Sequence, residues 1–358
     1  MQAYYDELIK LVKENRFTKQ QLVHEKMKLC KKYSVRRIPK DIDVLLHASA
    51  ADLPLVRKRL MTKPVRSMSG VAPVAIMTEP HGCPHGRCTY CPGGPDSSFG
   101  DVPQSYTGKE PAAMRAARNR YDAYLQVMNR LEYYVLCGHT PDKVELIIMG
   151  GTFPALSARY QEAFVRDALA AMNDFGRLFF LGGRFRVARF KAFFELPGDV
   201  HDEARLRRIQ KRMRSHETRS LSEEQRRNET SFIKCVGMTI ETRPDADIVG
   251  QAERMLRLGA TRVELGVQSI YDDVLAAVER GHTVQDSVRA IQVCKDLGFK
   301  VNAHIMPGLP GSDFDRDVRM FHELFSDTRF RPDMLKIYPC MVMPGTRLAE
   351  EYMLGRFI

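Results

Sequence analysis

The segment His81-Gly-Cys-Pro-His-Gly-Arg-Cys-Thr-Tyr-Cys-Pro-Gly-Gly94 contains three cysteines, Cys83, Cys88 and Cys91, within nine residues. Three thiolates this close together can hold three irons of a cubic iron–sulfur cluster, which leaves the fourth iron free to bind a substrate. Glycine and proline fill most of the other positions, and glycine lets the backbone approach an inorganic cluster closely. The segment therefore predicts a loop that wraps around an iron–sulfur cluster.

Zinc is the alternative ligand of this loop. A structural zinc site needs four ligands, which usually come as two pairs. The chain has no second cysteine pair, so His81 or His85 would have to complete the site. From this segment alone, zinc stays open as the less favoured interpretation.

The remaining cysteines indicate the compartment. They are scattered without any pairing pattern, which argues against a secreted disulfide framework and for a reducing cytosol. The N-terminus has charged residues where a signal peptide needs an apolar core, and no apolar run is long enough to span a bilayer. We therefore expect a cytoplasmic protein that does not contact a membrane. The scattered positions are Cys30, Cys137, Cys235, Cys294 and Cys340.

Positive charge is concentrated at the start of the chain. The net charge is +11, and residues 1–66 contain sixteen Lys or Arg against seven Asp or Glu. A concentrated positive field attracts polyanions, so nucleic acid is the leading partner. The alternative is a set of solvated helix faces that only keep the protein in solution.

The hydrophobic pattern changes near residue 70. Residues 1–66 read as short amphipathic helices, and Pro64 with Gly70 marks a boundary. Beyond it, apolar strands alternate with helices, which is typical of a parallel α/β barrel whose ligand sites lie at the C-terminal strand ends. We expect an α/β fold, a partial parallel (β/α)6 TIM-like barrel with a basic helical N-terminal segment. The expected strands are 71–78, 144–149, 236–241, 262–267, 300–306 and 334–338, and the expected helical stretches are 110–136, 161–172, 251–258 and 315–325.

Residues 181–234 interrupt this alternation with a strongly basic stretch. Four phenylalanines, at positions 185, 190, 193 and 194, interleave with its charges. Aromatic rings beside cations suit base stacking with phosphate contact. A helical excursion packed together by its own phenylalanines explains the pattern equally well, so both interpretations remain open.

Several short motifs follow the expected strands. Met149-Gly-Gly-Thr152 predicts a tight turn, and Glu241-Thr-Arg-Pro-Asp245 ends a strand with polar groups. In the latter region Asp245 or Asp247 could simply cap a helix. Alternation places Glu264, Gly266 and Gln268 on one strand face, where inward polar groups need a ligand or a buried network as partner.

Taken together, these positions resemble the radical S-adenosylmethionine (SAM) superfamily. Longer runs resemble the catalytic subunit of Elongator in its single-chain archaeal form, over roughly residues 68–350, and the basic N-terminal segment also fits that family. Besides the cysteine segment, the runs are Pro103-Gln-Ser-Tyr-Thr-Gly108, Lys143-Val-Glu-Leu-Ile-Ile-Met-Gly-Gly-Thr-Phe153, Thr239-Ile-Glu-Thr-Arg-Pro-Asp245, Gly266-Val-Gln-Ser269, Arg280-Gly-His-Thr283 and Leu335-Lys-Ile-Tyr-Pro339.

The resemblance implies a cofactor set and residues to hold it. Cys83, Cys88 and Cys91 would carry a 4Fe-4S cluster, and SAM would bind its open iron. Gly150, Gly151 and Thr152 would meet the amino end of SAM. Glu241, Arg243 and Gln268 are candidates for its ribose and carboxylate, and Tyr90 joins the cofactor-binding set.

The resemblance also implies a reaction on tRNA. In the family, a 5′-deoxyadenosyl radical takes a hydrogen atom from the acetyl methyl of acetyl-CoA. The resulting carbon radical adds to C5 of the wobble uridine in the anticodon stem-loop. Thioester hydrolysis then leaves 5-carboxymethyluridine. Lys143 matches a lysine associated with acetyl-CoA and is included with the catalytic residues, although an exposed lysine before a strand needs no such role.

The expected organisation has three parts. They are a basic tRNA-binding segment at 1–69, a radical SAM barrel at 70–350 with the basic insertion at 181–234, and at 351–358 the start of a linker. Family members continue into an acetyltransferase-type domain that we expect this chain to lack, so we expect the carboxymethylation to be incomplete with this chain alone. A homo-oligomer or Elongator-type partners would be compatible, and DNA is not expected.

Two other functions remain. The chain could be a catalytically silent tRNA-binding iron–sulfur protein. It could also be another radical enzyme, such as a methylthiotransferase or a relative of porphyrinogen oxidases, but a methylthiotransferase would be expected to carry a second set of three cysteines.

Overall fold

The computed structural model describes residues 1–199, 202–215, 217, 219–244 and 247–357. Asp245, one of the two candidate helix caps, and part of the basic insertion lie outside these residues. Asp247 does precede a helix, but its side chain makes no capping hydrogen bond. The chain forms two compact units, each described by itself below. The first comprises Met1–Pro73, Val127–Val144 and Leu169–Lys234, and the second comprises Val74–Gln126, Glu145–Ala168 and Cys235–Ile358.

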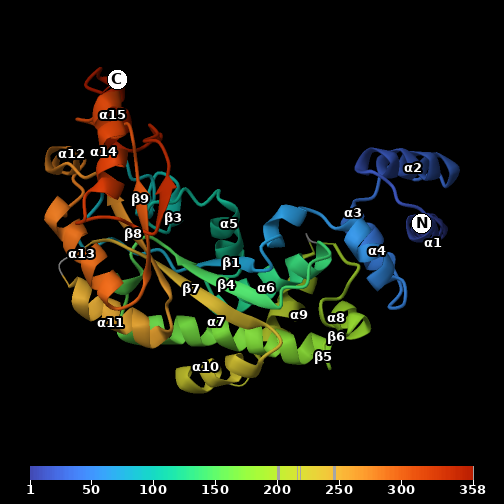
Figure 1. Ribbon diagram of the computed structural model, residues 1–358. Coiled ribbons are helices and arrows are strands. Elements are labelled where there is room, and N and C mark those ends of the chain that lie inside the picture. Colours follow the sequence, from blue (N-terminus) through green and yellow to red (C-terminus); the bar gives the residue numbers. More distant parts are fainter. Residues whose placement is uncertain (200–201, 216, 218, 245–246, 358) are drawn as a thin grey trace. The chain divides into compact units, whose positions relative to one another are not determined.

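The second unit is built on a curled sheet of six parallel strands (Figure 1). Each sheet strand pairs with the next one along the chain, which is the order that successive β/α units produce. The expected α/β half-barrel and its strand positions are confirmed. The strands are β1 (Ala72–Met77), β4 (Lys143–Met149), β7 (Lys234–Thr242), β8 (Arg262–Gln268), β9 (Lys300–Ile305) and β10 (Met334–Ile337).

The strand register sets which side chains are neighbours. Glu241 on β7 pairs with Glu264 on β8, and Glu264 pairs with Asn302 on β9. His304 on β9 pairs with Lys336 on β10. Since parallel strands end at one edge of the sheet, this register brings their polar groups together there.

Helices and a hairpin complete this unit, and α13 packs on β8, β9 and α11. Strands β2 (Gly94–Ser97) and β3 (Gly100–Val102) form an antiparallel hairpin directly after the cysteine loop. The helices are α5 (Pro111–Arg118), α11 (Ile248–Leu258), α12 (Asp272–Ala277), α13 (Val284–Asp296), α14 (Phe314–Ser326) and α15 (Arg347–Met353), with a short 3-10 turn, η2, at Phe153–Ala155.

The helical stretch expected over 110–136 is present, but it is divided into two helices. Between α5 and α6 (Ala123–Leu136), Arg120 and Tyr121 adopt left-handed φ values of 53° and 56°. The Asn119 side chain binds the Arg115 carbonyl oxygen at 2.8 Å, and Asp122 accepts a hydrogen bond from the Leu125 N–H at 2.9 Å. Short polar side chains thus end one helix and begin the next within the same apolar period.

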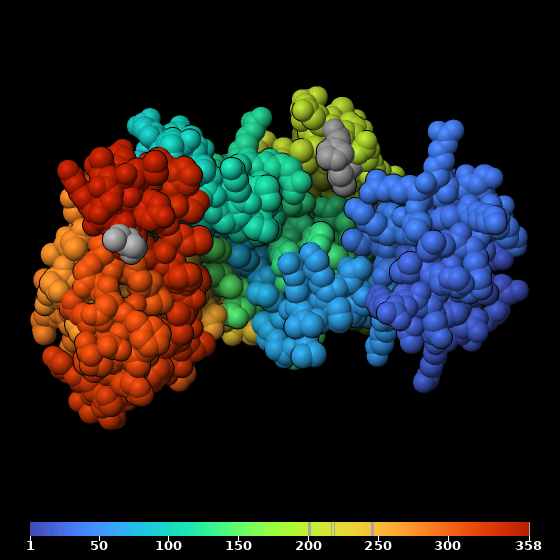
Figure 2. All heavy atoms as spheres, turned by 90° about the horizontal axis from the view of Figure 1, so that it is seen from above, coloured from blue at the N-terminus to red at the C-terminus, as the bar shows by residue number. Residues whose placement is uncertain are grey.

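Four helices at the N-terminus pack on one another in the first unit, and residues 1–60 gather in one mass (Figure 2). Tyr4, Leu8, Val12, Val44 and Leu60 are fully buried between them. The expected amphipathic helices are therefore present, and their apolar faces meet one another. They are α1 (Gln2–Glu14), α2 (Lys19–Lys32), α3 (Asp41–His47) and α4 (Leu53–Leu60), followed by the 3-10 turn η1 (Pro64–Ser67).

The basic insertion packs around a phenylalanine core in the same unit. Phe190 and Phe194 lie 4.9 Å apart between ring centroids, and both contact Phe175 and Phe179. All four rings are buried, so the packing interpretation holds for Phe190 and Phe194, and these rings are not available for base stacking. Phe175 and Phe179 belong to α7 (Ala158–Phe179), which precedes the insertion and has residues in both units. The elements that follow it are β5 (Phe180–Leu181), β6 (Arg184–Phe185), α8 (Val187–Phe193), α9 (Glu203–Arg214) and α10 (Leu221–Thr230).

The compact units do not follow the expected sequence boundaries, because 127–144 and 169–234 group with the N-terminal helices. The division at residues 69 and 350 stays a prediction. Among the described residues, no helix has both the length and the apolar character needed to cross a membrane.

The phenylalanine core offers a stability test. Replacing Phe194 by alanine removes a fully buried ring and leaves a cavity, so we expect a loss of about 3–5 kcal/mol in unfolding free energy, measured with urea. The matched control is Val23→Ala on the exposed face of α2, which should change the free energy by less than about 0.5 kcal/mol. Equal effects of the two substitutions would contradict the packing.

Candidate active site

A cavity of about 370 Å³ opens at the C-terminal strand ends of the second unit. It is lined by the cysteine loop on one side and by residues of β7 to β10 on the other. Most sequence-predicted site residues meet here, although they come from distant parts of the chain. The predicted residues that line it are Cys83, Cys88, Tyr90, Cys91, Gly151, Thr152, Glu241, Arg243 and Gln268.

Each cysteine sulfur has a polar neighbour. The Thr152 hydroxyl lies 3.4 Å from Cys83 Sγ, and Arg280 Nη1 lies 3.6 Å from Cys88 Sγ. The Gln104 side chain donates an N–H to Cys91 Sγ at 3.4 Å. Hydrogen bonds of this kind support sulfur that carries negative charge.

This donor set fits an iron–sulfur cluster. Burial raises the pKa of the Cys83 and Cys91 thiols, so they stay protonated unless a metal takes the place of the proton. All three sulfurs face one cavity, and two buried guanidinium groups, Arg243 and Arg280, line the same space. Their positive charge suits an anionic cluster with three thiolates.

The turn after β4 requires both of its glycines. Gly150 has φ +136°, and a Cβ there would lie 2.0 Å from Thr78 Oγ1. Gly151 has φ +91°, and its Cβ would lie 3.0 Å from the Gln104 side chain. The Gly150 N–H points to Glu241 Oε2 at 3.4 Å, which joins this turn to the end of β7.

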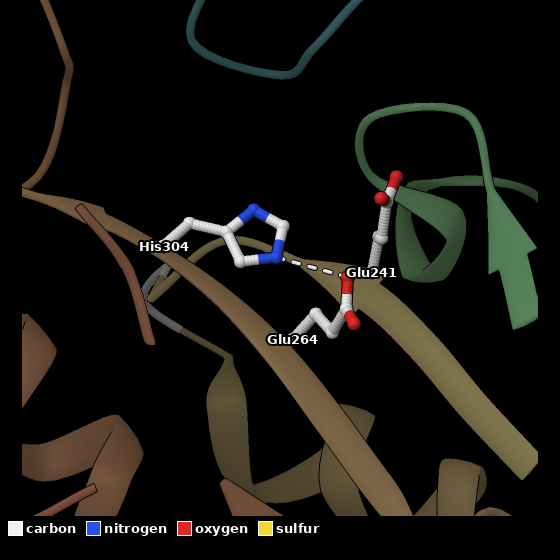
Figure 3. A group of neighbouring side chains, drawn as sticks. All are labelled: Glu241, Glu264 and His304. Atoms are coloured by element: carbon white, nitrogen blue, oxygen red, sulfur yellow. Dashed lines mark hydrogen bonds and ion pairs between the residues drawn. The ribbon is translucent and has the colours of Figure 1, made fainter. Parts of the chain in front are cut away.

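The strand ends carry a buried network of charges. Glu264 Oε2 lies 2.9 Å from His304 Nε2 (Figure 3). The other oxygen of Glu264 accepts a hydrogen bond from the Asn302 side chain at 3.2 Å. Burial opposes ionisation of Glu264, but the hydrogen bond from His304 and the charge of Lys336 outweigh it and lower the pKa of this carboxyl to about 2. The second ring nitrogen of His304 lies on the side of the ring away from Glu264 in Figure 3.

Glu241, Glu264 and His304 resemble a metal-binding group, since their ligand atoms lie within 4.8 Å of one another. However, Lys336 Nζ lies 3.4 Å from Glu241 Oε1 and 3.3 Å from Glu264 Oε2. An ammonium group therefore already supplies the positive charge between these carboxylates. We assign the group to an internal ion network and not to a metal ion.

An irregularity at the end of β8 directs Gln268 toward the cavity. The register between β8 and β9 shifts between Leu265 and Gln268, and Gln268 has φ +69°. Bulges of this type redirect a side chain near a site. The Gln268 carbonyl side-chain oxygen accepts a hydrogen bond from the Tyr338 hydroxyl at 3.1 Å.

The structure leaves Lys143 apart from these residues. Lys143 is exposed at the first position of β4, whereas the cavity follows the last position of that strand. It does not line the cavity. Its predicted role with acetyl-CoA gains no support from this location.

Sequence reasoning named several cavity residues only as parts of longer runs. Gln104, Arg280 and Lys336 belong to runs quoted for the family resemblance, but none received a role. A signal was present for Lys336, because a lysine inside an apolar strand needs a buried partner.

The site and sheet define a parallel α/β half-barrel with a three-cysteine cluster loop after its first strand. A family model of the radical SAM superfamily matches residues 80–324, and a model of the ELP3 N-terminal domain matches residues 2–68. The chain belongs to the radical SAM superfamily. Membership implies a 4Fe-4S cluster and SAM.

Named relatives confirm the resemblance to Elongator's catalytic subunit. The chain is 45% identical over 319 residues to "tRNA uridine(34) acetyltransferase" of Methanocaldococcus infernus, with 89% of this chain and 52% of that protein covered. It is 39% identical over 337 residues to human "Elongator complex protein 3", with 93% and 54% covered. The chain therefore spans about half the length of the curated relatives it matches.

A solved structure supports the same relationship. Elp3 of Methanocaldococcus infernus with an N-terminal deletion of residues 1–46 superposes with a TM-score of 0.57 at 37% identity. The match covers 80% of this chain and 50% of that chain.

His282 generates a prediction about pH. Burial, reinforced by the charges of Arg280 and Arg243, lowers the pKa of His282 to about 2. The unfolded chain binds this proton near pH ~6.5 while the folded chain does not, so acid favours unfolding. When the pH falls from ~6.5 to ~5, the unfolding free energy of both proteins should fall. The fall should be smaller in His282→Gln by about 1–2 kcal/mol, as measured by urea unfolding at each pH.

The control for this experiment is His24→Gln, which changes an exposed histidine on α2. Its pH dependence should follow that of the unsubstituted chain. A His282→Gln curve parallel to both would show that this imidazole is not held neutral.

Proposed function

We propose that this chain is the radical-generating and tRNA-binding part of an enzyme that modifies C5 of the wobble uridine in tRNA. The observation that carries the proposal is the convergence of Cys83, Cys88 and Cys91 with the polar strand ends in one cavity. The product would be 5-carboxymethyluridine, with SAM and acetyl-CoA as co-substrates. The names of the relatives support tRNA as the substrate.

Cys83, Cys88 and Cys91 would hold the 4Fe-4S cluster, and the open iron would bind SAM. When reduced, a cluster of this kind supplies the electron that cleaves SAM to a 5′-deoxyadenosyl radical. The protein's own task is to bind, orient and exclude water, and the buried cavity walls suit that task.

We assign the SAM contacts to the polar groups around the cavity. The turn at Gly150, Gly151 and Thr152 would meet its amino end, and Glu241, Arg243 and Gln268 its ribose and carboxylate. The Gly150–Glu241 hydrogen bond supports this assignment, because it links the two sets. Tyr90 lines the cavity beside Cys91 and would close it on that side.

The far side of the cavity would receive the uracil base. A base must leave its stack to enter such a pocket, and there it needs hydrogen-bond donors and acceptors. Glu264, His304 and Lys336 offer both kinds of group on one wall. The exposed cations of the N-terminal helices would bind the tRNA backbone.

The acetyl-CoA part of the proposal concerns residues and domains away from the cavity. Lys143 would contact it, yet this lysine lies outside the cavity lining. Because the chain spans about half the length of its relatives, we propose that the acyl donor is delivered by a further domain or an Elongator-type partner.

The cluster assignment can be tested with Cys83→Ala. After anaerobic reconstitution, the unsubstituted chain should be brown and, with reductant, convert SAM to 5′-deoxyadenosine, which mass spectrometry detects. Cys83→Ala should lose both properties, because two thiolates cannot retain the cluster.

Cys235→Ala is the matched control, since this cysteine does not line the cavity. It should keep the colour and the SAM cleavage. SAM cleavage that persists in Cys83→Ala would refute the assignment, and tRNA binding without any cleavage by the unsubstituted chain would indicate the catalytically silent alternative.

The tRNA assignment can be tested with Arg36→Ala/Arg37→Ala. Both side chains are exposed just after α2. If each contacts a phosphate, the double variant should bind tRNA more weakly, and the slope of log K against log salt should fall by about 2. Filter binding over a salt series measures both quantities.

Arg254→Ala/Arg289→Ala removes the same charge from exposed positions on α11 and α13. This control should retain most of the affinity. Equal losses in the two double variants would mean that only net charge matters.

A further inference from the structure

Gln104 supplies an amide donor to a cluster cysteine from outside the cysteine motif. Its Nε2 lies 3.4 Å from Cys91 Sγ, although the two residues are thirteen positions apart in the sequence and the β2–β3 hairpin lies between them. The side chain is only 3% exposed. A buried amide loses its hydrogen bonds to water, which costs free energy. The hydrogen bond to the sulfur offsets part of this cost.

Two glycines make the space that Gln104 occupies. A Cβ at Gly94 would lie 2.6 Å from Gln104 Oε1, and a Cβ at Gly151 would lie 3.0 Å from Gln104 Cβ. Gly94 ends the cysteine loop and Gly151 belongs to the turn after β4. Two segments that are distant in sequence thus leave room for one amide beside the sulfur.

The backbone around Gln104 is also held in an uncommon conformation. Ser105 has φ +71°, which is unfavourable for a residue with a side chain. The Ser105 hydroxyl lies 3.9 Å from Cys91 Sγ, and the Tyr106 hydroxyl donates to Glu241 at 2.9 Å. Strain of this kind persists where surrounding contacts fix it, commonly at functional sites.

Arg280 provides a second donor of the same kind. Its Nη1 lies 3.6 Å from Cys88 Sγ, while Nη2 donates to the Gly266 carbonyl at 2.6 Å. A Cβ at Gly266 would lie 2.4 Å from Nη2, so a glycine again makes the room. Two of the three cysteine sulfurs therefore receive an N–H from a residue beyond the cysteine loop.

We propose that Gln104 and Arg280 tune the reduction potential of the cluster, an inference that rests on the proposed function of the three cysteines. Reduction adds an electron to a centre that is already anionic. An N–H directed at sulfur stabilises the reduced form more than the oxidised form, which makes the potential less negative. Gln104 is thus a positioning residue: its N–H raises the reduction potential of the cluster, so that a weaker reductant is able to reduce it.

The test is a redox titration of the reconstituted chain followed by electron paramagnetic resonance. Gln104→Met keeps the length of the side chain and removes the N–H. Its midpoint potential should move to a more negative value, with cluster content equal to that of the unsubstituted chain. SAM cleavage with a weak reductant should fall, and a stronger reductant should restore it.

Gln161→Met is the matched control, because Gln161 is also buried but donates to the carbonyl oxygens of Pro154 and Leu156. Its midpoint should not move. An unchanged midpoint potential in Gln104→Met with full cluster content would overturn this inference and leave the proposed function intact. Failure of the unsubstituted chain to hold a cluster would overturn the proposed function, and the inference with it.

A second measurement covers the case in which Gln104→Met loses its cluster. The unsubstituted chain, labelled with 15N in glutamine side-chain amides, should show a 15N hyperfine coupling to the reduced cluster. The absence of that coupling would refute the contact without recourse to any variant.

Discussion

The ammonium of Lys336 lies between the buried carboxylates Glu241 and Glu264, and the active-site edge of the sheet depends on this contact. Two carboxylates on neighbouring strands would repel each other in a dry cavity, and each would lose hydration. Lys336 and His304 offset both effects. Since the four groups come from β7, β8, β9 and β10, the network fixes four strand ends relative to one another.

Small residues form the second constraint on the site. The walls of the cavity approach so closely that a side chain at Gly150, Gly151 or Gly266 would meet Thr78, Gln104 or Arg280. Gly151 and Gly266 do more than turn the chain, because they leave space for Gln104 and Arg280, whose side chains donate to cysteine sulfurs. The polar groups that would surround the cofactors therefore reach their positions because the neighbouring residues are glycines, which have no side chain.

Local patterns in the sequence located the sheet strands, and the family resemblance named most of the candidate residues that the fold brings to the cavity. Apolar runs of strand length located all six sheet strands, and alternation placed Glu264, Gly266 and Gln268 on one face. Periodicity alone could not locate the break at Arg120 and Tyr121, because the apolar spacing continues across it. The stacking interpretation of Phe190 and Phe194 likewise failed because only the tertiary structure shows that both rings are buried.

Gln104 illustrates why the remainder of the site was not predictable. Its contact with Cys91 depends on a hairpin, on a left-handed turn at Ser105 and on space beside two glycines. None of these has a periodic signature, and a glutamine in a loop is ordinarily exposed. Spacing within a motif reports the groups that bind a cofactor directly. The residues that adjust its chemistry are brought together by the fold, so they are recognised from buried side-chain N–H groups directed at the sulfur atoms that would bind the cluster.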